Sequence, residues 1–414
     1  MVASCRLCES SDIEVFVDFG SLAMTGFFPQ ENESVNVAPL ALGKCQACGL
    51  VQLRDKLPIS ELYGPGYGYE SHLNTSMQSH LKEVARKLEL LLRLRSGDVV
   101  VDIASNDGTL LSGYANSGLQ LIGIDPLISF LTDNYPSHTI KLDKFFSKEA
   151  YFSVTKKKAK LITSFSVFYD LDDPIRFAHD ICSILADDGV WVLEQSYLPT
   201  MVRSLGFDTI CHEHLLYLSL NDIQDICNKV GLEIVDFVLN DVNGGSIQIL
   251  IQKNKGPKMP SPHISPFLKF ESESRLISNE GLIDFGKQIE VYKNNLLNIT
   301  KAFKDRGYEI QGLGASTKGN VLLQVCELDK ETISAIGEVN PKKFGRFTPG
   351  SAIPIVDENE IFEGVSRDRL ILVLPWHFKE SIAKKAKLRR LENAFLLFPL
   401  PYEPSVFDIS SGGL

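Results

Sequence analysis

The sequence lacks any long hydrophobic run, since no stretch approaches about 18 consecutive apolar residues, and a transmembrane helix is therefore not expected. The opening residues, MVASCRLCES, contain no basic segment followed by an apolar run, so a signal peptide is not expected either. Positive charge is also scarce, with 42 lysines and arginines against 52 aspartates and glutamates and a net charge of −10. We therefore expect a cytoplasmic protein that binds neither nucleic acid nor membranes.

Cysteine is infrequent as well, and its distribution is uneven. Of eight cysteines, four lie in two C-x-x-C pairs near the start, Cys5 with Cys8 and Cys45 with Cys48. Two such pairs can supply four thiolates in tetrahedral geometry to zinc, and disulfides are disfavoured in a reducing cytosol. Because four cysteine ligands leave no open coordination position, the sequence predicts a structural Zn²⁺ site.

The chain is longer than one typical domain, at 414 residues. From residue 98 onward, apolar strands alternate with helical segments, which is typical of a parallel sheet covered by helices. A polar segment with several prolines at 252–266 marks a boundary, and a second strand–loop–helix unit begins at Tyr308. The predicted fold is α/β, with a small zinc-binding domain in 1–68 and two doubly wound domains in 69–255 and 256–414.

The segment VVVDIASNDGTLL, at 99–111, is typical of a strand, a turn of small residues and the start of a helix. The next strand ends at Asp125, where a carboxylate is well placed to accept both ribose hydroxyls of an adenosyl group. The G-x-G-x-x-G pattern of dinucleotide sites is absent, and Asp107 occupies the turn, where it would repel a pyrophosphate. The turn therefore favours the cationic cofactor S-adenosylmethionine over NAD.

The segment FYDLDDP follows the third strand and is expected at the rim of this site, where aromatic residues can border a sulfonium group. The alternative, for the turn taken alone, is a doubly wound domain without a ligand. The predicted cofactor-binding residues are Asp102, Ala104, Ser105, Asn106, Gly108, Asp125, Pro126, Phe168 and Tyr169.

The segment FDTICHEHLLYLS, at 207–219, contains His212, Glu213 and His214. It follows the fourth strand, and ligands of doubly wound domains bind beyond the carboxyl ends of the strands. The spacing differs from the H-E-x-x-H motif of zinc proteases, in which the second histidine lies one helical turn after the first. A histidine that titrates near neutrality beside a carboxylate suits a general base, and the alternative is a pair of buried, hydrogen-bonded histidines.

A second glycine-containing turn, GLGASTKGN at 312–320, follows a strand and opens a helix. Its backbone amides and Lys318 are suited to a diphosphate, and the alternative is a folded relic of a nucleotide-binding unit. The segments FTPGSAIPI and LPWHF are explained equally well by packing, so His377 is not included among the catalytic residues.

Eleven segments occur together in one order: CRLC, CQAC, YGYESHLNTSM, VVDIASNDGTLL, FYDLDDP, EQSYLP, FDTICHEHLLYLS, NDVNGGS, GASTKGNVLLQ, FTPGSAIPI and LPWHF. From Cys5 to Pro401 the chain resembles the sugar C-methyltransferases, which act on nucleotide-linked 4-keto-deoxysugars in the synthesis of branched sugars. The resemblance implies a zinc-binding N-terminal domain, a central Rossmann-like class I methyltransferase domain that binds S-adenosylmethionine, and a C-terminal Rossmann-like domain.

The resemblance also implies roles for single residues. His214 matches the base of that family, Glu213 lies in its active site, and Tyr69 matches an active-site tyrosine. Cys211 stands where the family often has a tyrosine, so a tyrosine contact with the sugar is in doubt here. The predicted catalytic residues are His214, Glu213, His212 and Tyr69, and the predicted substrate-binding residues are Cys211, Thr317, Lys318 and Asn320.

These expectations combine into one reaction. We expect S-adenosylmethionine-dependent C-methylation, at carbon 3, of a dTDP- or GDP-linked 4-keto-6-deoxysugar, by removal of the α proton and attack of the enolate on the methyl group. The chain is expected to act as a monomer. A methyltransferase for another small molecule or RNA is one alternative, which the acidic balance disfavours for RNA. A non-catalytic protein with two Rossmann-like domains is the other, which the intact HEH motif disfavours.

Overall fold

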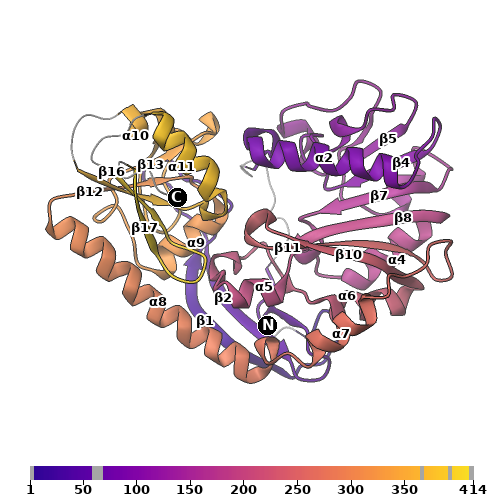
Figure 1. Cartoon of the computed structure of the whole chain (residues 1–414), viewed down its shortest axis with the longest axis horizontal. Helices are drawn as coiled ribbons and strands as arrows, with labels where there is room; N and C mark the ends of the chain where they lie inside the picture. The colour runs from indigo at the N-terminus through magenta and orange to yellow at the C-terminus, as the bar shows by residue number, and fades with distance from the viewer. Residues whose placement is uncertain (1–3, 58–68, 364–367, 390–393, 410–414) are drawn as a thin grey trace.

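The computed structural model describes residues 4–57, 69–363, 368–389 and 394–409. Three sheets form the framework, and the two larger ones lie on either side of the molecule (Figure 1). The N-terminal strands and one long helix join them along one edge in the same view. Among the helices of these described segments, none is long and apolar enough to cross a membrane.

The N-terminal sheet is antiparallel, with the order β1-β2-β3-β9. Its first three strands are β1 (Ile13–Ala23), β2 (Val37–Cys45) and β3 (Val51–Leu53). The fourth strand, β9 (Leu216–Tyr217), comes from much later in the chain and begins two residues after His214. The N-terminal sheet therefore includes the backbone that follows the HEH motif.

The central sheet has seven strands in the order β10-β11-β8-β7-β4-β5-β6. Five of them are parallel: β4 (Val99–Ile103), β5 (Gln120–Ile124), β6 (Ile140–Leu142), β7 (Ala159–Phe165) and β8 (Leu185–Ser196). The strands β10 (Leu232–Asn240) and β11 (Ser246–Lys253) are antiparallel and close one side. The helices here are α2 (Thr75–Leu91), α3 (Lys148–Phe152), α4 (Pro174–Ile184), α5 (Leu198–Arg203), α6 (Leu220–Val230) and α7 (Ile264–Ser272).

Successive residues of the central strands pack into cores on opposite faces of the sheet. Val100 packs in the same core as Val84 and Leu88 of α2, whereas Val101 shares a core with Ile181 of α4. This alternation follows from the two-residue period of a strand. The predicted strand–turn–helix at 99–111 differs in one respect, because only a short 3-10 helix, Leu111–Gly113, follows the turn.

The C-terminal sheet has six strands in the order β14-β13-β12-β15-β16-β17. They are β12 (Glu309–Leu313), β13 (Ile336–Glu338), β14 (Ile355–Asp357), β15 (Arg369–Val373), β16 (Ala394–Phe398) and the antiparallel edge strand β17 (Ser405–Asp408). The accompanying helices are α8 (Asn279–Asp305), α9 (Thr317–Val325), α10 (Glu358–Glu363) and α11 (Lys379–Leu388).

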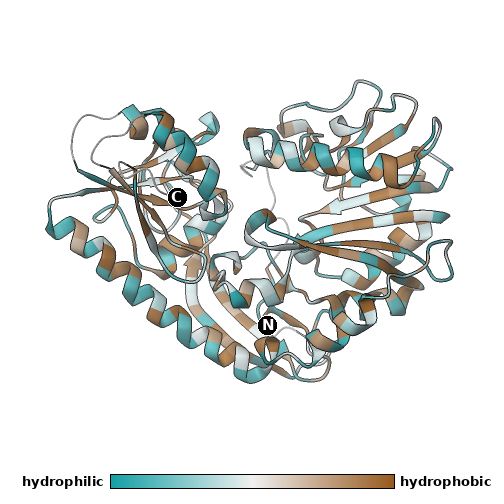
Figure 2. Cartoon of the chain, viewed as in Figure 1, coloured by the Kyte–Doolittle hydropathy of each residue, from teal (hydrophilic) through white to brown (hydrophobic). Residues whose placement is uncertain are grey.

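Helix α8 packs between the N-terminal strand β1 and the C-terminal strand β12. Its buried residues recur every three or four positions, and Figure 2 shows hydrophobic and hydrophilic residues mixed along this helix. The buried face consists of Leu282, Phe285, Ile289, Tyr292, Leu296 and Thr300. At Gly286 the helix comes so close to β1 that a Cβ atom would lie 2.8 Å from the carbonyl oxygen of Phe16.

The predicted α/β class with two doubly wound units behind a small zinc-binding unit is confirmed. The predicted domain boundaries remain predictions. The first of them, at residue 68, and the Gly/Pro/Tyr-rich connection before it lie outside the described residues. Strand β9 lies within the predicted second domain in the sequence but pairs with β3 of the N-terminal sheet. Division of the chain at single residues therefore does not separate the first two units completely.

Candidate active site and zinc site

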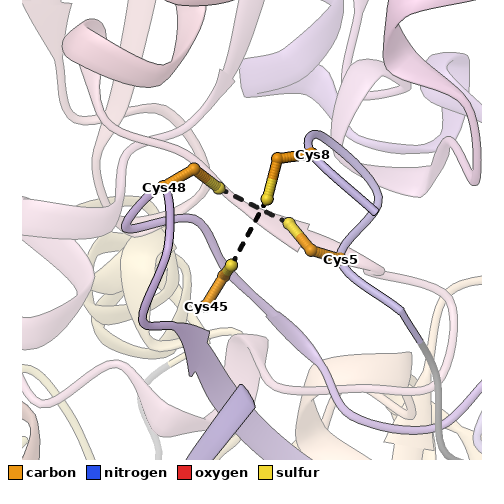
Figure 3. A group of neighbouring side chains, drawn as sticks. All are labelled: Cys5, Cys8, Cys45 and Cys48. Atoms are coloured by element: carbon orange, nitrogen blue, oxygen red, sulfur yellow. Dashed lines mark hydrogen bonds between the residues drawn. The ribbon is translucent and has the colours of Figure 1, made fainter. Parts of the chain in front are cut away.

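Four cysteine side chains from two loops of the N-terminal unit converge at one point (Figure 3). Cys5 Sγ lies 3.5 Å from Cys48 Sγ, and Cys8 Sγ lies 3.5 Å from Cys45 Sγ. All four sulfur atoms lie within 4.8 Å of one another. Thiolates at about 2.3 Å from a central zinc ion are about 3.8 Å apart in a tetrahedron, so this cluster fits Zn²⁺. The four cysteines complete the coordination shell, which makes the ion structural.

The N-terminal sheet also contacts the HEH motif and the strand that follows it. Strand β3 pairs with β9 directly after the motif, and His212 Nε2 lies 3.1 Å from the carbonyl oxygen of Ala38 in β2. His212 is fully buried and does not line the large cavity described next. The structure therefore assigns His212 a structural role in place of the predicted catalytic one, because its ring is enclosed in the protein interior.

A cavity of about 800 Å³ lies between the central and C-terminal sheets. Its central wall is formed by the turns after β4, β5 and β7, by the start of α2 and by Glu213 and His214 of the HEH motif. Its opposite wall is formed by the turns after β12, β13 and β15. Both walls thus use the carboxyl ends of parallel strands, where doubly wound domains bind ligands, and the volume suits a small-molecule site.

Seven of the predicted cofactor-binding residues lie along the central wall: Asp102, Ala104, Ser105, Asn106, Asp125, Pro126 and Tyr169. The turn after β4 is sharply bent, since Ala104 and Asn106 have positive φ angles of 57° and 50°. A positive φ is uncommon for residues other than glycine and asparagine, so at Ala104 the surroundings must fix it, as they often do at ligand sites. The Asp125 carboxylate accepts the backbone N–H of Asn106 at 3.0 Å and of Leu127 at 2.8 Å. It is thereby fixed at the end of β5 and retains lone pairs for ribose hydroxyls.

Phe168 and Gly108, also predicted to bind the cofactor, do not line the cavity. The Phe168 ring is fully buried and packs 5.6 Å from Phe177 and 5.5 Å from Trp191, centroid to centroid. Gly108 has a φ of 84°, and a Cβ atom there would lie 2.5 Å from the Tyr135 ring. Glycine is therefore required at this position by the packing of a tyrosine and by the backbone conformation.

Asp107 plays a different role from the predicted one. Its Oδ1 accepts hydrogen bonds from the backbone N–H and the hydroxyl of Thr109, at 3.1 and 2.6 Å. Its Oδ2 accepts the backbone N–H of His72 at 2.8 Å and lies 2.8 Å from His72 Nδ1. Because Asp107 is fully buried away from the cavity, it fixes the turn and does not face a ligand charge. The argument that Asp107 selects a cationic cofactor is wrong.

His214 lines the cavity with one nitrogen already engaged. Its Nδ1 lies 2.9 Å from the carbonyl oxygen of Thr209. Because a carbonyl only accepts, Nδ1 carries the proton of the neutral ring, and Nε2 keeps its lone pair. Burial, followed by the positive charge of Lys318, lowers the pKa of His214 to about 3. The ring is therefore neutral at pH 7 and able to accept a proton at Nε2.

Glu213 also lines the cavity, and its Oε2 accepts a hydrogen bond from Thr25 Oγ1 at 3.3 Å. Burial raises the pKa of this carboxyl. The orientation of His214 is set by the Thr209 carbonyl instead of by Glu213.

Cys211, predicted to bind substrate, is fully buried and does not line the cavity, so its role is in packing.

On the C-terminal wall, Thr317 and Lys318 line the cavity as predicted substrate-binding residues. Asn320, predicted with them, points away, because its side-chain N–H donates to the carbonyl oxygen of Thr25 at 3.4 Å and the residue is fully buried. Lys318 Nζ donates to the carbonyl oxygen of Asn243, 2.9 Å away in the central domain. On the central wall, Tyr69 lines the cavity at the entrance to α2.

Several lining residues had not been identified from the sequence. Two of them, Glu338 and His377, lie at or just beyond the carboxyl ends of β13 and β15. The rule that ligands bind at this edge of parallel strands was the signal that pointed to them. His377 was left out of the predicted catalytic residues because packing explains LPWHF equally well.

Family models match the chain in three consecutive segments. Residues 5–63 match "Putative zinc binding domain", 73–236 match "Methyltransferase domain" and 241–401 match "C-methyltransferase C-terminal domain". The C-methyltransferase NovU of Streptomyces niveus is 26% identical over 417 residues, which cover 99% of this chain and 98% of that protein.

Among solved structures, the mitomycin 7-O-methyltransferase MmcR is 15% identical and covers 43% of this chain and 54% of its own, with a TM-score of 0.34. The plantazolicin methyltransferase BpumL in complex with SAH is 12% identical and covers 42% of this chain and 82% of its own, with a TM-score of 0.33. The family models account for all three units in order, and the relative spans the whole chain. This chain is an S-adenosylmethionine-dependent C-methyltransferase with a zinc-binding N-terminal domain, a methyltransferase domain and a C-methyltransferase C-terminal domain.

Proposed function

We propose that the enzyme methylates carbon 3 of a nucleotide-linked 4-keto-6-deoxysugar, with His214 as the base. One observation carries the proposal: His214 lines a cavity between the two large sheets with Nδ1 held by the Thr209 carbonyl. The free Nε2 is then the atom that removes the proton α to the ketone. The cofactor turn after β4 borders the same cavity, so base and methyl donor have access to the same carbon.

The chain's own residues have to lower a large barrier. A proton α to a ketone is less acidic than an ordinary imidazolium by roughly ten pKa units, which is about 14 kcal/mol at about 1.36 kcal/mol per unit. The lowered pKa of His214 widens this difference. A single base does not overcome this difference, so donors at the developing enolate oxygen must contribute. S-adenosylmethionine, when bound, supplies an activated methyl group that the carbanion at carbon 3 takes up.

The remaining residues divide between the two ligands. Asp125, with Ser105 and the backbone of the turn, holds the adenosyl group, and Tyr169 borders the methyl donor. Glu213 and Tyr69 contact the sugar, and Thr317 begins the helix on the substrate side. The nucleotide is dTDP or GDP. A methyltransferase for another small molecule or for RNA is the alternative, and the excess of acidic residues counts against RNA.

The proposal is tested by mass spectrometry in deuterated water. The protein is mixed with S-adenosylmethionine and either dTDP- or GDP-linked 4-keto-6-deoxyhexose. We expect the substrate to gain one methyl group, and we expect deuterium at carbon 3 when the cofactor is replaced by its demethylated product. The His214→Asn variant is the control, with both signals lost and cofactor affinity unchanged by calorimetry. Binding of the cofactor without either signal, for these sugars and their 2-deoxy forms, would contradict the proposal.

A further inference from the structure

Two side chains of the C-terminal domain reach the part of the cavity that contains His214. Lys318 lies in the first turn of α9, and His377 lies in the short helix Trp376–Phe378 after β15. Burial, and after it the positive charge of Lys318, lowers the pKa of both His214 and His377. Contacts between neighbouring residues bring the three groups to one region of the cavity. The Trp376 indole N–H donates to Asp208 Oδ2 at 2.7 Å, and the carbonyl oxygen of the next residue, Thr209, lies 2.9 Å from His214 Nδ1. Lys318 Nζ donates to the carbonyl oxygen of Asn243, the residue before Gly244, on which Trp376 packs.

Lys318 is held by a hydrogen bond to the central domain and keeps further N–H donors for a ligand. Its Nζ donates one hydrogen bond, to the Asn243 carbonyl at 2.9 Å, and an ammonium group has three donors. Within the described part of the chain, no carboxylate lies within ion-pair distance of this nitrogen. The acidic group that acts on it is Asp208, whose Oδ2 is occupied by the Trp376 indole N–H at 2.7 Å.

His377 has an unused nitrogen. Among the described residues, its Nδ1 has no hydrogen-bond partner and is enclosed in the protein, so Nε2 is the ring nitrogen left to meet a ligand in the cavity. The ring is also held in place, because the neighbouring Trp376 is bonded to Asp208 and packs so closely on Gly244 that a Cβ atom there would lie 2.5 Å from its ring.

We propose that Lys318 and His377 form the oxyanion site of the enzyme and bind the ketone oxygen of the substrate opposite His214. This inference rests on the proposed function and adds to it the donors that the weak base needs. Both side chains come from the C-terminal domain, so that domain takes part in the chemistry as well as in substrate binding.

The electron balance of the step is simple. His214 Nε2 takes the proton from carbon 3, and the electron pair of the C–H bond moves into the enolate, whose negative charge lies on the ketone oxygen. Lys318 Nζ–H and the His377 ring N–H donate hydrogen bonds to that oxygen. When carbon 3 forms its bond to the methyl group, the electron pair of the broken S–C bond stays on sulfur, and the ketone is restored.

The test separates enolate formation from methyl transfer. The wild type and the Lys318→Met, Lys318→Arg and His377→Phe variants are compared for deuterium uptake at carbon 3 without methyl transfer, and for kcat and KM of methylation. We expect Lys318→Met to slow both reactions by about 100-fold with cofactor affinity unchanged, because one oxyanion donor is lost. We expect Lys318→Arg to recover part of this loss, and His377→Phe to lower kcat more than it raises KM.

Lys379→Met is the matched control, because this lysine follows His377 closely but lies over the Phe398 ring and not along the cavity. Circular dichroism and melting temperature check that each variant is folded. Wild-type rates of deuterium uptake in Lys318→Met would overturn the oxyanion site while leaving the proposed function intact. A wild type that neither exchanges nor methylates any of the ketosugars would overturn both.

Discussion

The imidazole ring of His214 lies 4.2 Å from the ring of Tyr169, centroid to centroid, with the planes inclined by 51°. Tyr169 stands in the segment after β7 that borders the cofactor turn, and His214 stands on the HEH motif. The proposed base is therefore held between a backbone carbonyl on its edge and an aromatic ring near its face. This contact links the position of the base to the cofactor side of the cavity.

Removing the Tyr169 ring should impair catalysis more than binding. We expect Tyr169→Leu to lower kcat by about tenfold or more, because an aromatic pair is worth about 0.5–1.5 kcal/mol and a misplaced base costs additional rate. Tyr169→Phe keeps the ring and should retain most of kcat. Steady-state kinetics with both variants measures the difference, and equal losses in both would show that the hydroxyl is what matters.

The pH dependence of kcat/KM should extend to unusually acidic values. His214 acts in its neutral form, so activity falls as pH drops through its pKa, and that pKa is lowered to about 3 by burial and Lys318. We therefore expect the acidic limb well below the ordinary histidine value of about 6.5. In Lys318→Met the cation is absent, so the limb should move to higher pH. An acidic limb near 6.5 in the wild type that shifts in Lys318→Met, and therefore belongs to His214, would contradict the lowered pKa.

Stability should change with pH for the same reason. Between pH 6.5 and the lowered value, the unfolded chain binds a proton at His214 that the folded chain does not bind. Stability is therefore expected to decrease as pH falls below 6.5, at up to about 1.4 kcal/mol per pH unit for each such histidine. Urea unfolding from pH 7 to pH 5 measures this slope, and His214→Asn should reduce it.

Two aspartates of the cofactor domain should behave differently when replaced by alanine. Asp125 lines the cavity, so Asp125→Ala should weaken S-adenosylmethionine binding, by about tenfold or more for the lost ribose contacts. Asp107 is buried with four hydrogen-bonding contacts, so Asp107→Ala should lower the free energy of unfolding by about 1–3 kcal/mol. Calorimetric titration and chemical denaturation of both variants test this separation, which fails if Asp125→Ala destabilises the fold as much as Asp107→Ala.

Removing zinc should inactivate the enzyme through the fold. The cysteine cluster includes the end of β2 and the loop before β3. Strand β2 contacts His212 through the carbonyl of Ala38, and β3 pairs with β9, which follows the catalytic motif. We expect a chelator, or Cys8→Ser, to lower both the melting temperature and activity, with a zinc content of one ion per native chain. Full activity of a zinc-free protein at unchanged melting temperature would contradict a structural ion.

The sequence predicted those parts of the site whose residues are close in the chain. The C-x-x-C pairs, the acid at the end of β5 and the turn at Ala104–Asn106 follow from spacing and strand ends, and the structure places them accordingly. The HEH motif was recognised as a unit, but its three members separate in the structure. His214 and Glu213 face the cavity and His212 faces Ala38, a division that depends on backbone direction at each residue.

The sequence by itself determined the α/β class, the zinc ligands and the existence of a cofactor turn, because these depend on local period and spacing. Only the tertiary structure decided which side chains meet across the cavity. Lys318 and His377 line the same cavity as His214 from another sheet, Thr25 meets Glu213, and Asp107 is buried in the interior. Contacts between residues so far apart in the chain arise from the packing of whole domains, and neither hydrophobic period nor motif spacing encodes that packing.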